Sequence, residues 1–77
     1  MNIKEISKVV ETVERAGFEF VTVLEKEDGR VLVVSKVKKA LPFSTDEYAT
    51  HEYHNNSIFW GHYDLTEMQA MESIQVR

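Results

Sequence analysis

The chain has 77 residues, a length that makes one domain over residues 1–77 with a thin hydrophobic core. Its 13 acidic and 9 basic residues give a net charge of −4, which disfavours nucleic acid as a partner because such affinity comes mainly from neutralised phosphates. The sequence has no cysteine for disulfides or thiolate metal clusters, no signal-peptide pattern and no run of about 18 apolar residues to span a membrane, so we expect a cytoplasmic protein.

Residues 2–16 carry the pattern of an amphipathic helix. Apolar side chains recur at helical spacing, which places them on one face. Asn2 is a favourable N-cap, and Gly17 supplies the left-handed residue that commonly follows a last helical turn. The apolar positions are Ile3, Ile6, Val9, Val10 and Val13. We therefore predict a helix over residues 2–16 with one buried face.

Residues 18–26 and 30–39 are rich in β-branched and aromatic side chains and predict a β-hairpin. Asp28-Gly29 between them favours a two-residue turn, which sets the strand register. The strand face that this register offers to the N-terminal helix carries Phe18, Phe20, Leu24, Val31, Val33 and Val37. The basic run at the end of the hairpin, Lys36, Lys38 and Lys39, is interpreted as a solvated strand edge and not as a phosphate contact.

Residues 40–46 form a predicted loop, and a second hairpin is predicted over 47–63. Asparagine tolerates a positive φ, so Asn55-Asn56 can form its turn. This turn would place Tyr53 opposite Ile58, His51 opposite Trp60 and Ala49 opposite His62 on one side of the hairpin. The other side would carry Tyr48, Phe59 and Tyr63.

Residues 65–76 predict a closing helix, with Asp64 as the N-cap and Glu67 at the third helical position. The element order is then α-β-β-β-β-α. We predict an α+β domain in which two hairpins form a four-stranded antiparallel sheet, with two helices packed on one face or on both.

The second hairpin concentrates the side chains that could carry chemistry. Five of the chain's eight aromatic residues and all three histidines lie within residues 48–63. His51 and His62 would share a face, but no cysteine or carboxylate there completes a four-ligand metal site. Ser57 lies near His54 without a third group to orient the imidazole. We therefore predict no catalytic residue, no metal and no cofactor.

A binding surface is the more plausible role for this hairpin. If Tyr48, Phe59 and Tyr63 face inward, the opposite side is an amphipathic strip of the kind found at protein interfaces. The strip consists of Trp60, His62, Tyr53, His51 and Ile58. Two alternatives remain open from the sequence: the C-terminal helix covers the strip, or a protein partner does, including a second copy in a homodimer.

Residues 48–72 resemble the C-terminal half of small bacteriophage and mobile-element proteins of bacteria. The resemblance rests on an aromatic-Trp-Gly-His-Tyr strand, here Phe59 to Tyr63, that leads into a helix containing Ala70. It implies a phage or host-cytoplasm context, and it implies no catalytic residue because those proteins have no settled activity.

These observations favour a small non-enzymatic accessory protein that binds another protein, such as a host or defence protein, and the resemblance implies that it is phage-encoded. The acidic balance suits a basic partner. The alternative is a small-molecule or nucleotide-binding module that uses the same aromatic and histidine side chains. A structural homo-oligomer is the third hypothesis.

Overall fold

The structure is a computed structural model that describes residues 1–37 and 47–77. The predicted loop over 40–46, together with Lys38 and Lys39, lies outside the described residues. The elements in chain order are α1 (Ile3–Arg15), β1 (Phe18–Glu25), β2 (Val31–Val37), β3 (Tyr48–His54), β4 (Ser57–Leu65) and α2 (Glu67–Val76).

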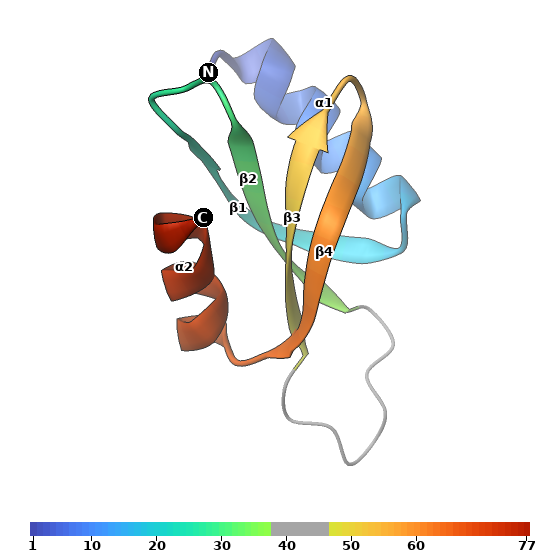
Figure 1. Cartoon of the computed structure of the whole chain (residues 1–77). Coiled ribbons are helices and arrows are strands. Elements are labelled where there is room, and N and C mark those ends of the chain that lie inside the picture. The colour runs from blue at the N-terminus through green and yellow to red at the C-terminus, as the bar shows by residue number, and fades with distance from the viewer. Residues whose placement is uncertain (38–46) are drawn as a thin grey trace.

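The four strands form one antiparallel sheet in the order β1-β2-β3-β4, and the two helices lie on opposite faces of it (Figure 1). The predicted α+β fold and its α-β-β-β-β-α order are therefore confirmed. Of the two packing arrangements left open by the sequence, the structure has a helix on each face. Neither of these helices, the two within the described ranges, is long and apolar enough to cross a membrane.

Each face of the sheet has a small apolar core of its own. The core beneath α1 is built on the buried residues Val9, Val13 and Val33. The core beneath α2 is built on the buried residues Leu32, Val34, Ala70 and Ile74. Strand β2 contributes to both cores because successive side chains of a strand point to opposite faces. Its near-continuous apolar sequence therefore reflects a central strand buried on both sides.

Helix α1 spans Ile3–Arg15, within the predicted 2–16, and it has the N-cap and the following glycine that the sequence predicts. The side-chain oxygen of Asn2 accepts a hydrogen bond from the backbone N–H of Glu5 at 2.9 Å, which satisfies one of the free donors of the first turn. Gly17 follows the helix with a φ of 95°, a left-handed conformation that lets the chain turn into β1.

The β1–β2 turn is longer than the predicted two-residue loop. The backbone N–H of Lys26 donates to the carbonyl of Arg30 at 2.7 Å, and the N–H of Gly29 donates to the carbonyl of Lys26 at 2.9 Å. Glu27, Asp28 and Gly29 therefore form a three-residue loop. Gly29 has a φ of 93°, as expected for the last position of such a loop. The predicted two-residue turn is wrong.

A β-bulge between Phe20 and Thr22 shifts the register of β1 again. Phe20 packs beneath α1, as the sequence predicts. Beyond the bulge the alternation is reversed, because one extra residue moves every later side chain to the other face. Val23 consequently joins the core beneath α1, and Leu24 packs beneath α2 instead of α1. The predicted placement of Leu24 is wrong for this reason.

Helix α2 begins two residues later than the sequence predicts. Thr66 is its N-cap: the threonine hydroxyl accepts from the backbone N–H of Gln69 at 3.1 Å, and the Gln69 side chain accepts from the backbone N–H of Thr66 at 2.9 Å. Asp64, the predicted cap, remains in β4 because the following residue, Leu65, still pairs with Tyr48 of β3.

Candidate aromatic binding site

The β3–β4 turn is the Asn55-Asn56 loop that the sequence predicts. The two residues have φ angles of 48° and 62°, the left-handed values of a tight hairpin turn. Tyr53 pairs with Ile58 beside it, which confirms the predicted register at this end of the hairpin.

A β-bulge at Trp60 interrupts that register further along β4. Trp60 and Gly61 together lie opposite the single residue His51, so every later residue of β4 is shifted by one. His62 therefore pairs with Thr50, and the predicted pairing with Ala49 is wrong. Trp60 has a φ of 48°, which is rare for a bulky side chain and costs of order 1–3 kcal/mol. Surrounding contacts must hold this conformation.

Arg77, which follows α2, supplies two of those contacts. Its guanidinium donates to the carbonyl oxygen of Trp60 at 2.6 Å and to the hydroxyl of Thr50 at 3.0 Å. Thr50 is fully buried on β3. One planar side chain therefore joins both strands of the hairpin at the bulge, and it links the position of Trp60 to the end of α2.

Two exposed aromatic rings result on the α2 side of the hairpin. Phe59 pairs with Glu52, whose other neighbour Leu32 belongs to the core beneath α2. Helix α2 does not cover this end of the hairpin, so Phe59 is 44% exposed and Trp60 is 68% exposed. Their ring centroids are 5.6 Å apart, with an angle of 45° between the ring planes. Such a pair offers a large apolar surface to a partner.

These rings line an open pocket of about 310 Å³, called here the aromatic pocket. Its lining consists of Glu52, His54, Phe59 and Trp60. Two flat apolar walls thus stand beside a carboxylate and an imidazole, the mixture of apolar surface and few polar groups that is typical of ligand sites.

His51 lies on the other face of the hairpin and is only 3% exposed. Its Nε2 atom is 3.0 Å from the hydroxyl oxygen of Tyr63, and its ring packs edge-on against Phe18. Its Nδ1 atom is buried with no hydrogen-bond partner among the described residues. Burial, followed by the positive charge of Arg77, lowers the pKa of His51 below its ordinary value of 6.5. Both effects favour the neutral form of the imidazole.

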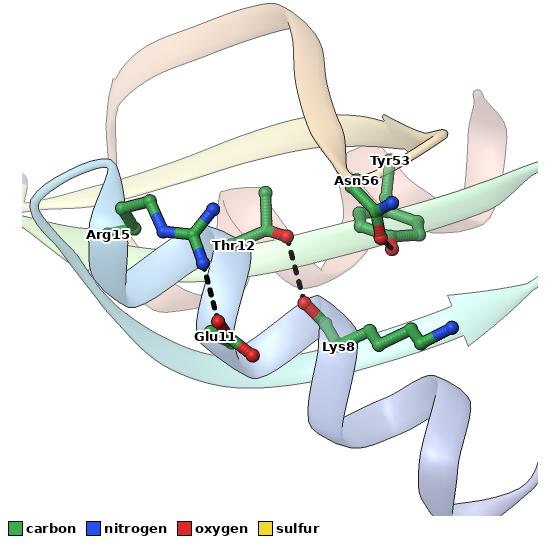
Figure 2. A network of polar contacts seen from close by, with 6 residues as sticks. All are labelled: Lys8, Glu11, Thr12, Arg15, Tyr53 and Asn56. Atoms are coloured by element: carbon green, nitrogen blue, oxygen red, sulfur yellow. Dashed lines mark hydrogen bonds and ion pairs between the residues drawn. The ribbon is translucent and has the colours of Figure 1, made fainter.

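A second, polar groove runs between α1 and the β3–β4 turn. Its lining consists of Lys8, Glu11, Thr12, Arg15 and Asn56, and Figure 2 shows these side chains together with Tyr53. Arg15 forms an ion pair with Glu11, and the hydroxyl of Tyr53 donates to the side chain of Asn56 at 3.0 Å. Several of its polar groups thus satisfy one another, and the groove offers less free binding capacity than the aromatic pocket.

The structure divides the five predicted site residues between two faces. Tyr53 and Ile58 are partly buried and pack on the core beneath α1, next to the buried His51. Trp60 and His62 are exposed. Helix α1, and not the C-terminal helix, therefore covers the strip in part. Trp60 still lies opposite His51, but the bulge places its side chain on the other face of the hairpin.

Phe59, Glu52 and His54 complete the aromatic pocket but are not among the site residues predicted from the sequence. Phe59 was expected to face inward, as was Tyr63, and both are exposed. Gly61 gives the relevant signal, because a glycine inside a strand often marks a bulge. A bulge there breaks the alternation on which the inward assignment depends.

Comparison of the chain with protein-family models, with curated proteins and with solved structures found no match. Within residues 1–37 and 47–77, no cluster of three or more histidine, aspartate or glutamate side chains is arranged to hold a metal ion.

Proposed function

We propose that this chain is a small non-enzymatic accessory protein that works by binding another protein through the aromatic pocket. The observation that carries the proposal is the exposed pair Phe59 and Trp60, which α2 leaves uncovered. Tryptophan and phenylalanine are enriched at protein interfaces, and tryptophan is prominent among the residues whose truncation weakens binding most.

The rigidity of the site supports the same proposal. Arg77 holds the carbonyl of Trp60, and the tight Asn55-Asn56 turn fixes the end of the hairpin. A surface that is already ordered loses little conformational entropy when a partner binds, so more of the contact energy appears as affinity. His62, exposed on the same strand, would lie at the edge of this interface.

The resemblance of residues 48–72 to small phage and mobile-element proteins supports a phage-encoded protein that acts in the bacterial cytoplasm. The net charge of −4 favours a basic partner, such as a host or defence protein that handles nucleic acid.

The proposal is tested by comparing proteins captured from a bacterial lysate by the immobilised wild type and by Trp60→Ala. The control is Met68→Ala, which removes a side chain that is 71% exposed on α2, away from the pocket. We expect a partner that the wild type and the control retain and that Trp60→Ala loses. Identical capture by all three proteins would contradict the proposal. The solution mass of the purified chain shows whether the partner is a second copy.

A small-molecule or nucleotide ligand is the second candidate, and the volume of the aromatic pocket favours it. About 310 Å³ lies at the lower end of the range of roughly 300–1,000 Å³ that small-ligand pockets occupy. A small ligand would raise the melting temperature of the isolated wild type progressively as its concentration exceeds its dissociation constant, but not that of Trp60→Ala.

A further inference from the structure

We propose that the aromatic pocket receives a single arginine side chain of the partner protein. This inference rests on the proposed function and specifies its chemistry. It depends on the combination of two exposed aromatic faces, a carboxylate without a cationic partner in the described ranges, and a volume suited to one long side chain.

The aromatic walls favour a cation. The electron-rich face of an aromatic ring attracts a positive charge within about 6 Å of its centroid, and tryptophan does so most strongly. Phe59 and Trp60 present two such rings 5.6 Å apart, tilted at 45° to each other. A planar guanidinium can stack on one ring while the methylene groups of its side chain contact the other.

The carboxylate of Glu52 gives the pocket its charge. No basic side chain within residues 1–37 and 47–77 forms an ion pair with it, whereas Arg15, Arg30 and Lys36 pair with other carboxylates. Glu52 is partly buried, so solvent and salt screen its charge less than that of a fully exposed group. A guanidinium can donate two parallel hydrogen bonds to such a carboxylate.

The same charge disfavours the competing ligand classes. A phosphate or a partner carboxylate placed in the aromatic pocket would meet Glu52 in a chain whose net charge is already −4. A purely apolar side chain would cover the carboxylate without compensating it, which carries a desolvation cost. The arginine side chain satisfies both the rings and the carboxylate.

The test uses a blocked glycine peptide with one central arginine and the same peptide with citrulline, which keeps the shape but has no charge. Trp60 is the chain's single tryptophan, so its fluorescence reports binding directly. We expect the citrulline peptide to bind the wild type about tenfold more weakly, from the lost cation–π and ionic attraction. Equal affinity of the two peptides would overturn the proposal without any variant.

Two charge variants locate the effect. Glu52→Gln should weaken arginine binding about fivefold and leave citrulline binding unchanged, because it removes the ionic attraction and keeps the rings. Glu72→Gln removes the same charge from an exposed position on α2 and should have no effect. If both variants weakened binding of the arginine peptide equally, the affinity would depend on net charge, and Glu52 would be excluded as the specific partner of the arginine. Tighter binding of a lysine peptide than of the arginine peptide would overturn the choice of arginine.

The outcome is independent of the lysate experiment. If the pocket binds the arginine peptide but no protein is captured from the lysate, the arginine site is supported and the proposed function is contradicted. A partner that Trp60→Ala loses, together with equal affinity for arginine and citrulline, would keep the proposed function and overturn the arginine pocket.

Discussion

The imidazole Nε2 of His51 lies 3.0 Å from the hydroxyl oxygen of Tyr63, beneath the bulge that carries Trp60. The phenyl ring of Phe18 packs against both rings. The contact joins β3 to the shifted part of β4, so it depends on the extra residue in that strand. It also leaves a titratable group almost fully buried in the core beneath α1, and that group couples the fold to pH.

We expect the free energy of unfolding to fall as the pH decreases below 6.5. The folded-state pKa of His51 is lowered by burial and by Arg77, so below that pH the unfolded chain binds the proton more readily than the folded chain does. The contribution of His51 to the free energy of unfolding is therefore fully present above the pKa that the histidine has in the unfolded chain. It is lost as the pH falls toward the lower pKa of the folded chain. One proton contributes a slope of at most about 1.4 kcal/mol per pH unit.

Denaturant unfolding of the wild type and of His51→Phe between pH 5 and pH 8, a range of about one and a half units either side of the ordinary histidine pKa, measures this slope. The variant keeps an aromatic ring beside Phe18 and removes the proton site. His54 and His62 are present in both proteins, so the difference between the two slopes isolates the contribution of His51. The same pH dependence in both proteins would exclude His51 as its source.

Gly61→Ala should displace Tyr63 from His51. A Cβ atom at position 61 would lie 2.5 Å from the Tyr63 hydroxyl oxygen and 2.8 Å from His51 Nε2. We expect a loss of about 1–3 kcal/mol from overpacking, together with a changed NMR shift of the His51 ring. Gly17→Ala is the control: its left-handed φ makes an alanine unfavourable, but no atom lies within 4 Å of the added group. Its His51 signal should stay unchanged.

Arg77→Gln should destabilise the fold by about 1–3 kcal/mol, because two hydrogen bonds from a charged group to Trp60 and Thr50 are lost. The variant should also raise the pKa of His51. The rise should be incomplete, since burial is the larger cause of the lowered pKa and Arg77 the smaller. An NMR titration of the imidazole measures it. Arg15→Gln, which breaks only an exposed ion pair, should leave that pKa unchanged and cost no more than about 1 kcal/mol.

The two possible caps of α2 predict opposite results. Thr66→Ala should destabilise the protein by about 1 kcal/mol, because it removes the hydroxyl that accepts from Gln69. Asp64→Gly should stabilise it or leave it unchanged, since the φ of 58° at Asp64 suits glycine better than aspartate. Thermal unfolding measures both. Destabilisation by Asp64→Gly without an effect of Thr66→Ala would favour Asp64 as the cap.

The features that the sequence predicted correctly are local ones. The N-cap of α1, the glycine that follows it and the Asn55-Asn56 turn each depend on residues within a few positions of one another. The alternating spacing of apolar residues in the strands and their helical spacing in the helices are then enough to predict the order of the elements. The α+β fold follows because each amphipathic element needs another layer against which to bury its apolar face.

The errors in which face a strand side chain occupies arise mainly where β-bulges add a residue to one strand. Besides the bulges between Phe20 and Thr22 and at Trp60, a third lies at Asp64, where Tyr63 and Asp64 together are opposite Ala49. All three depend on packing between strands, and only the one at Trp60 has a sequence signal, the adjacent Gly61. Each one reverses the alternation beyond it. For this reason the five predicted site residues do not form one outward strip, and Phe59 joins Trp60 at the surface.

The same bulges have a consequence for how copies of the chain meet in concentrated solution. Strands β1 and β4 are the two edges of the described sheet (Figure 1). Both strands carry β-bulges. An irregular edge presents a broken ladder of N–H and C=O groups, which is a poor template for another strand. Edge-to-edge polymerisation into fibrils is thereby discouraged, and the chain can display an apolar surface beside β4 without a regular strand edge that would recruit further copies.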